Sequence, residues 1–332
     1  MSLFQTNAWQ SAWWDTWGSE HGLELIRPWG QGTSGIYSTE YRIKSFVPIT
    51  SVEFVGSSYR KIRGTRTEYN RFFLPGESAE PSEKALEQTL VSLNWSEAVF
   101  DDLPLDSRDV ALVKAIAFKN GWLVRTINRD SAWAINTEGR FDNYLKKLGS
   151  NTRLRLFNRR KVLESLGDIA HENYAEQYSD PKAFFETLNR FHLKRWGKPA
   201  YGNSALKFNS LFLQRIGSEG GEPQLLIVKC SGQPISLLYN VKYKGSIYNL
   251  QSGFNENFHN KLALGTLHLG YAIERAFMDE SVRCFDLLAG SGKHENYKSR
   301  IATESVELIS LMVVRGTLLK ALYYIRDRWS RV

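Results

Sequence analysis

The sequence predicts a mixed α/β protein whose sheet combines antiparallel and parallel strands. Three short strand patterns are separated by two hairpin-turn signals, residues 231–234 and Lys244-Gly245. An amphipathic helix and a fourth apolar strand follow them. This order predicts an antiparallel meander, a crossover helix and a strand that returns parallel to the third strand. The five segments are residues 224–228, 235–241, 247–254, 262–273 and 282–288.

A sheet that changes from antiparallel to parallel pairing is expected to open at one place. The third and fourth strands are joined through a helix, so their ends lie beside the N-terminus of that helix. Helix N-termini favour phosphate groups, because their backbone N–H groups lack partners within the helix. The sequence therefore predicts a ligand crevice between residues 247–254 and 282–288.

The first half of the chain repeats a similar alternation of strands and helices. Helical patterns at residues 81–93 and 107–119 alternate with strand patterns at 97–100, 122–127 and 132–136. With 332 residues, the chain is also long enough for two domains. We therefore expect one domain over residues 1–165, ending in a basic connecting helix, and a second over residues 166–332.

Composition bounds the partners and the compartment. The net charge of +8 and the pI near 9.3 favour anionic partners. No apolar run approaches the roughly 20 residues of a membrane-spanning helix, and the first residues lack the pattern of a secretory signal. Cys230 and Cys284 have no paired spacing, which is typical of buried thiols in a reducing compartment. We expect a cytoplasmic protein.

Two segments could each bind a partner, and for both the sequence allows an alternative interpretation. Residues 141–166 are strongly basic but lack the pattern of interleaved aromatic residues and glycines that is typical of an RNA-binding module. A connecting helix with some cations facing a cleft is therefore favoured over nucleic-acid binding. The last helical pattern, at residues 318–329, is amphipathic. Docking on its own domain is favoured over peripheral association with a membrane.

Aromatic residues gather near the start of the chain. Trp9, Trp13 and Trp17 follow helical spacing and so line one face of a helix. A buried core stripe is the favoured interpretation, and a platform for a sugar ring is the alternative.

Five short motifs follow one another along the chain, at residues 141–145, 191–196, 253–255, 285–290 and 297–300. In this order and spacing they resemble the CelD-type acetyltransferase domain, a GNAT family named from cellulose-biosynthesis proteins. The Trp-rich opening and the region of Tyr69 are similar to the N-terminal half of full-length members, so the resemblance spans nearly the whole chain. One departure is Leu262-Ala263-Leu264-Gly265, where members often carry Ser-Pro-Gly.

The resemblance implies a tandem GNAT-like fold and an N-acyltransferase. The expected reaction moves an acyl group from acyl-CoA, such as acetyl-CoA, to an amine, for example an amino sugar in exopolysaccharide or cell-envelope synthesis. The family is related to Fem peptidoglycan aminoacyl transferases, so transfer from charged tRNA is one alternative. A non-catalytic binding module in polysaccharide assembly is the other.

Acyl transfer to an amine needs a base, a donor to the thioester carbonyl and a proton for the leaving thiolate. The strand at 246–254 contains no Asp or Glu, so the base must come from elsewhere. Asp286 and His192 are the candidates, and Tyr297 is the candidate acid for the thiolate.

Binding residues are expected around the crevice. The cofactor is expected at Gly253 and Phe254 and at the start of the crossover helix, over Lys261, Leu262, Ala263, Leu264 and Gly265. No His/Cys cluster has metal-ligand spacing, and no P-loop or serine-hydrolase elbow is present, so no metal or ATP is expected. Seven residues are expected to bind the acceptor, two of which, Lys298 and Arg300, could instead bind a phosphate. The seven are Arg195, Trp196, Tyr69, Gln251, Asn255, Lys298 and Arg300.

Overall fold

A computed structural model describes residues 1–21, 23–26, 34–43, 47–57, 62, 64–72, 79–290 and 295–329. The chain forms two compact units. Residues 1–130 and 306–332 form the first unit, and residues 131–305 form the second. The expected division between residues 165 and 166 is therefore wrong: residues 131–165 belong to the second unit, and residues 306–332 belong to the first.

The second unit contains the predicted meander and crossover. Strands β6 to β9 pair antiparallel in sequence order, and β9 then pairs parallel with β10. Both hairpin turns place two residues at positive φ: Ser231 (48°) with Gly232 (76°), and Lys244 (46°) with Gly245 (78°). Such two-residue turns match the twist of paired strands. The elements are β6 (Ile169–Asn173), α7 (Tyr174–Gln177), α8 (Lys182–Trp196), α9 (Asn203–Ile216), β7 (Glu222–Cys230), β8 (Gln233–Tyr243), β9 (Ser246–Phe254), α10 (Leu264–Met278), β10 (Cys284–Ala289) and α11 (Glu295–Ile301).

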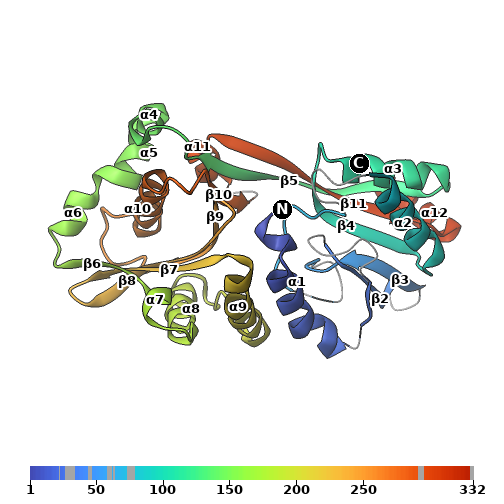
Figure 1. Ribbon diagram of the computed structural model, residues 1–332, viewed down its shortest axis with the longest axis horizontal. Coiled ribbons are helices and arrows are strands. Elements are labelled where there is room, and N and C mark those ends of the chain that lie inside the picture. The colour runs from blue at the N-terminus through green and yellow to red at the C-terminus, as the bar shows by residue number, and fades with distance from the viewer. Residues whose placement is uncertain are drawn as a thin grey trace. The chain divides into compact units, whose positions relative to one another are not determined.

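Helices cover both faces of this sheet. In Figure 1, α10 lies on one face of β7 and β8, and α7 to α9 lie on the other. Ile247 and Phe285, which are paired in register, belong to the same buried cluster as Ile273 of α10. Their burial identifies the face of the sheet that α10 covers.

The basic stretch packs against α10. It consists of four short helical segments: α4 (Phe141–Lys147), α5 (Ser150–Arg153), a π-helical turn (Leu154–Asn158) and α6 (Arg160–Glu164). The Arg160 guanidinium lies 4.2 Å from the centre of the Tyr271 ring and 2.5 Å from the Glu274 carboxylate. Gly270 lets the π-helical turn approach, since a Cβ there would lie 2.0 Å from the carbonyl oxygen of Leu156.

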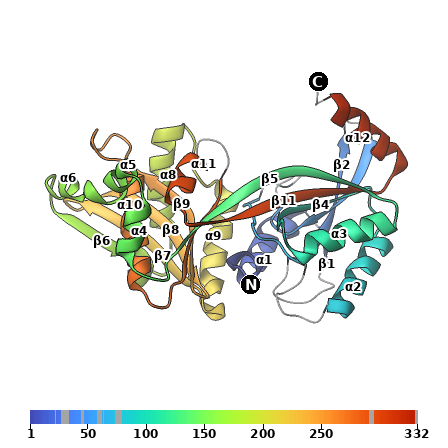
Figure 2. The ribbon, with the colours of Figure 1, turned by 90° about the horizontal axis from the view of Figure 1, so that it is seen from above.

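The first unit repeats the strand and helix order of the second. In register, β3 pairs parallel with β4, and the helix α2 connects them. Figure 2 shows α2 and α3 together on one side of β4 and β11, while α12 packs on the other side through Leu319 and Tyr323. The elements include α1 (Asn7–Trp13), β1 (Leu25–Ile26), β2 (Ile36–Ile43), β3 (Val47–Phe54), α2 (Ala79–Ser92), β4 (Glu97–Pro104), α3 (Arg108–Lys119) and α12 (Thr317–Trp329).

The two repeats exchange their last strands. The strand β5 (Leu123–Asn136) follows the helix of the first repeat, yet its end pairs antiparallel with β10 of the second unit. Conversely, β11 (Glu304–Val314) follows the second repeat and pairs antiparallel with β4 of the first unit. The two strands expected at 122–127 and 132–136 are therefore one. The exchange explains why the first unit is assembled from two parts of the sequence, with residues 131–305 of the second unit between them.

The tryptophan stripe is core. Trp9, Trp13 and Trp17 are 1%, 0% and 6% exposed, and the Trp9 indole N–H donates to Thr67 Oγ1 at 2.9 Å. A buried stripe is thus the correct interpretation and a sugar platform on these three rings is wrong. Within the described ranges, no helix combines the length and the apolar character that crossing a membrane requires.

Candidate active site

The predicted opening lies between β9 and β10. Their parallel pairing joins only Ser246–Tyr248 to Cys284–Asp286, although β9 continues to Phe254 along β8. The register between β8 and β9 shifts between Asn249 and Gln251, so that Leu250 has no register partner in either neighbouring strand. The two parallel strands separate after three pairs, and the bulged residue lies beside the separation.

Asp286 and Lys298 meet at the end of β10. Asp286 Oδ1 accepts a hydrogen bond from the backbone N–H of Leu288 at 2.7 Å. Lys298 Nζ donates to the carbonyl oxygens of Leu288 and Ala289, at 3.0 and 2.8 Å. Asp286 is 6% exposed and Lys298 is 9% exposed. Both side chains therefore bind the backbone where β10 leaves β9, rather than projecting into solvent.

His192 lies on the α8 side of the sheet. Its Nε2 is 2.7 Å from the carbonyl oxygen of Ser252 in β9. A carbonyl only accepts, so Nε2 carries the proton and Nδ1 of the neutral ring keeps a lone pair. Asp286 faces the same side, because its neighbours Phe285 and Leu287 belong to the cluster under α10. His192 can thus serve as a base through Nδ1.

A cavity of about 140 Å³ lies at the start of α10. Tyr297 and Arg300 of α11 line it, as predicted residues of the site. Partial burial raises the pKa of the Tyr297 phenol, which keeps it protonated and able to donate. The other lining residues are Asn151, Thr152, Arg155, Thr266 and Ile301.

The first turn of α10 offers backbone groups more than side chains. Its N-cap residue, Ala263, supplies no side-chain hydrogen bond, and the side chains of Leu262 and Leu264 are buried in the core. The Phe254 ring covers Gly265, where a Cβ would lie 2.4 Å from Cε1 of the ring. These predicted cofactor residues therefore contribute the shape and the uncapped N–H groups of the helix end. Lys261 is exposed beside them.

All but one of the other predicted binding residues lie at the end of α8 or at the end of β9. Arg195 lies 4.6 Å from the ring centres of both Trp196 and Phe254, and 3.2 Å from the Glu256 carboxylate, so it caps the ring that covers α10. Gln251, Gly253 and Asn255 lie at the end of β9 or directly after it. Gly253 packs on Leu188 of α8, since a Cβ there would lie 3.1 Å from Leu188 Cγ.

Tyr69 is the one predicted binding residue that lies outside the second unit. It belongs to the first unit, has a positive φ of 53°, and lies 6.2 Å from the Phe4 ring.

Five lining residues were not singled out from the sequence, Arg155 and Thr266 among them. Arg155 stood within the basic stretch without a role of its own, and Thr266 was expected only as part of a helix face. Arg155 lies in the π-helical turn that Gly270 admits, so this glycine inside α10 is the signal that could have placed it. Both add polar groups to the cavity with Tyr297 and Arg300.

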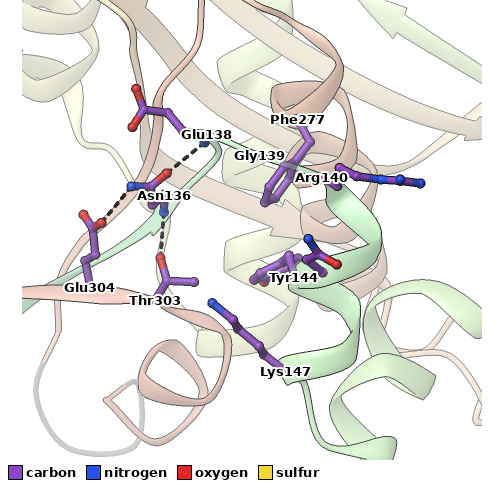
Figure 3. Close-up of a pocket in the computed structure, with 10 residues that line it drawn as sticks. Asn136, Glu138, Gly139, Arg140, Tyr144, Lys147, Phe277, Thr303 and Glu304 are labelled. Carbon is purple, nitrogen blue, oxygen red and sulfur yellow. Dashed lines mark hydrogen bonds between the residues drawn. The ribbon is translucent and has the colours of Figure 1, made fainter.

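A larger hollow of about 520 Å³ adjoins this cavity (Figure 3). Tyr144, which lines it, donates to the carbonyl oxygen of Ile301, a residue of the first cavity, at 2.9 Å. Asn136 is fixed there by Thr303 Oγ1 at 2.7 Å and by the Glu304 carboxylate at 3.0 Å. The lining mixes cations with carboxylates and so favours neither sign of ligand. The charged members are Arg140, Lys147, Glu138 and Glu304.

The cysteines and the possible metal ligands limit which reactions the site can carry out. Both cysteines are free, and burial raises the pKa of Cys284 to about 12, so its thiol stays protonated and is a poor nucleophile. Among the described residues, no group of three or more His, Cys, Asp or Glu side chains is arranged to hold a metal ion.

Comparisons with known proteins agree with this geometry. Residues 150–299 match a family model described as an acetyltransferase (GNAT) domain. This segment lies inside the second unit, which is therefore a GNAT-type acyltransferase domain, and the protein is an enzyme of the acyltransferase class. No curated protein matches the sequence.

Solved structures resemble the whole chain at low identity. FemX is 11% identical, with 97% of this chain and 94% of that chain covered and a TM-score of 0.58. The C-terminal domain of a putative lysylphosphatidylglycerol synthetase from Agrobacterium fabrum is 9% identical, with 97% and 92% covered and a TM-score of 0.54. L-PGS from Bacillus licheniformis is 11% identical, with 97% and 96% covered and a TM-score of 0.51. These likenesses show the fold, and the predicted tandem GNAT-like fold is confirmed.

Proposed function

We propose that the second unit transfers an acyl group from acyl-CoA to an amine in the opening between β9 and β10. The observation that carries this proposal is the short parallel pairing, which ends at Tyr248 and Asp286 while β9 runs on to Phe254. The opening gives a thioester access to the backbone of β9, beside the uncapped start of α10.

The cofactor would be held at its phosphates. Arg155 and Arg300 line the cavity at the start of α10, and the first N–H groups of that helix have no side-chain cap. Arginine binds phosphate oxygens through two parallel hydrogen bonds, and a helix N-terminus favours negative charge. The residues present therefore fit a pyrophosphate.

The reaction assigns one task to each side of the sheet. On the α8 side, Nδ1 of His192 takes the proton from the attacking amine. On the α10 side, the Tyr297 phenol gives a proton to the thiolate that leaves. The backbone N–H of bulged Leu250 is the donor we assign to the thioester carbonyl, whose negative charge grows as the amine attacks.

The acceptor we propose is an amino sugar of an exopolysaccharide or the cell envelope. The motifs that resemble CelD-type domains support it, and so do Arg195 and Trp196 at the end of α8. Trp196 is 53% exposed, so the ring face that Arg195 does not cover would be available for stacking on a sugar. Gln251 and Asn255 would orient the acceptor hydroxyl groups.

Transfer of an aminoacyl group from charged tRNA is the second candidate. It is favoured by the likeness to FemX over 97% of this chain and by the likeness to a putative lysylphosphatidylglycerol synthetase over the same share. The exposed cations of the basic stretch would contact tRNA phosphates, which predicts strong salt dependence.

Calorimetric titration with acetyl-CoA tests the first proposal. We expect micromolar binding by the wild type and about tenfold weaker binding by Arg300→Ala, because a charged hydrogen bond to phosphate contributes about 1.5–3 kcal/mol. Lys146→Ala, which removes an exposed charge outside the cavity, is the control and should bind like the wild type. Failure to bind any acyl-CoA, with retention of charged tRNA instead, would select the second candidate.

A further inference from the structure

Leu288 has an unusual backbone conformation for its residue type. Its φ is +62°, in the left-handed region that side chains other than glycine, asparagine and aspartate seldom adopt. At the same place the register between β10 and β5 shifts, between Asp286 and Ala289, and pairing with β9 has already ended. Such a conformation persists only when the surrounding structure imposes it.

Two buried charged side chains supply that constraint. The Asp286 carboxylate accepts from the N–H on one side of Leu288, and the Lys298 ammonium donates to the carbonyls on the other side. Burying a carboxylate and an ammonium is unfavourable unless hydrogen bonds replace the lost water. Here those hydrogen bonds go to the backbone of the strand end.

The first unit has a related arrangement at the equivalent position of its repeat. Asp102 has a φ of +50°, where β4 has passed its last pair with β3 and its register shifts against β11. Arg66 donates to both oxygens of the Asp102 carboxylate, at 2.6 and 2.8 Å. The N–H of Asp102 donates to Ser310 Oγ at 3.1 Å. A carboxylate and a cation thus accompany the left-handed residue in both units.

We propose that Asp286 and Lys298 are positioning residues that hold Leu288 in its left-handed conformation and so keep the end of β10 turned away from β9. The inference rests on the proposed function, because the space maintained in this way is the one that the thioester would occupy. Neither side chain transfers a proton in this role. Asp286 acts as an acceptor for one N–H, and Lys298 acts as a donor to two carbonyls.

A double-variant experiment separates positioning from direct contact with the ligand. Lys298→Met should weaken acetyl-CoA binding at least tenfold in calorimetry. Leu288→Gly should recover most of that loss when combined with Lys298→Met, because glycine adopts a positive φ without strain. If Lys298 instead touches the cofactor, Leu288→Gly would recover nothing, and the proposal would be overturned. Wild-type affinity in Lys298→Met would overturn it as well.

Asp286 is tested by a conservative pair. Asp286→Asn keeps an acceptor for the Leu288 N–H and should bind acetyl-CoA within about threefold of the wild type, whereas Asp286→Leu should lose at least tenfold. Equal losses in the two variants would contradict positioning through that hydrogen bond. Arg66→Met is the matched control in the other unit, and it should lower the melting temperature while leaving acetyl-CoA affinity unchanged.

Stability gives a readout that does not need the cofactor. The effects of Lys298→Met and Leu288→Gly on urea unfolding should be less than additive, because the second change removes the strain that the first leaves unsupported. A wild type that binds no acyl-CoA but shows this coupling would defeat the proposed function and retain the structural role. Strict additivity would defeat the structural role. If Lys298→Met fails to fold, the double-variant experiment is carried out with Lys298→Gln instead, with the same expected results.

Discussion

At the scale of single residues, hydrogen bonds decide which predicted groups remain available for chemistry. His192 uses one ring nitrogen on the Ser252 carbonyl and keeps the other for proton transfer. Asp286, by contrast, has one carboxylate oxygen bound to a backbone N–H. This difference favours His192 as the base, and a sequence alone does not contain it, because both residues belong to equally suggestive motifs.

His192→Gln should lower turnover at least tenfold, because the amide has no lone-pair nitrogen that can take the proton of the amine. Its effect on acetyl-CoA affinity should be small, since His192 lies on the face opposite α10. Steady-state rates with an amine acceptor measure the first effect, and calorimetry measures the second. Lys194→Gln, an exposed change on the same helix, serves as control. Unchanged turnover in His192→Gln would remove the base from the mechanism.

Tyr297→Phe should lower turnover several-fold and leave acetyl-CoA affinity nearly unchanged. The raised pKa of Tyr297 means that the wild-type phenol stays protonated through pH 9, so the loss should be similar from pH 7 to pH 9. Rates across that range check the expectation. A loss that appears only at the alkaline end would instead indicate another ionising group.

At the scale of elements, the meander, the crossover helix and the returning strand follow from patterns in the sequence. Apolar periodicity and two-residue turns identify them, because each signal is local. The short pairing of β9 with β10 and the positive φ of Leu288 are not local, since they depend on Lys298 ten residues later. The π-helical turn likewise leaves no local signal, because Gly270, which admits it, lies in a helix far along the chain.

Gly270→Ala should destabilise the second unit by roughly 1–3 kcal/mol, because the added methyl would overlap the Leu156 carbonyl and force the π-helical turn away from α10. Urea unfolding measures the change. Gly217→Ala is the matched control: that glycine has a φ of −60° and no atom within 4 Å of the position a Cβ would take. It should be neutral or slightly stabilising. Similar destabilisation by both changes would refute the packing argument.

At the scale of the whole molecule, the sequence indicates two related halves but not the exchange of their last strands. Residues 123–136 read as two short strands because the polar residues 128–131 interrupt the apolar pattern. Pairing partners far along the chain leave no local signal that the strand is continuous. Likewise, the carboxylates buried in the first unit look like ordinary strand residues. Their consequences appear in the pH dependence of stability.

Stability should fall as the pH rises from about 4.5 to 7. Burial raises the pKa of Glu53 to about 7, with the Tyr37 hydroxyl donating to it at 3.0 Å, and burial raises the pKa of Asp101 to about 6. The folded state then keeps protons that the unfolded chain releases, so each carboxyl contributes stability at low pH that is lost as the pH approaches its folded-state value.

Glu53→Gln should remove part of this fall, on the order of 2–3 kcal/mol between pH 4.5 and 7.5. The free energy of unfolding in urea, measured at several pH values, provides the comparison with the wild type. Glu24→Gln, an exposed change in the same unit, should leave the pH dependence of the unfolding free energy unchanged. If the unfolding free energy of Glu53→Gln falls with pH as steeply as that of the wild type, the Glu53 carboxyl is not held protonated in the folded state.

The opening between β9 and β10 is tested most directly by hydrogen–deuterium exchange with and without acetyl-CoA. If the cofactor lies there, amide exchange should slow in peptides covering residues 249–254, at the end of β9, and 262–267, at the start of α10. Peptides from the first unit should exchange at the same rate in both conditions. Saturating binding that slows exchange elsewhere, and leaves these two segments unchanged, would contradict the account.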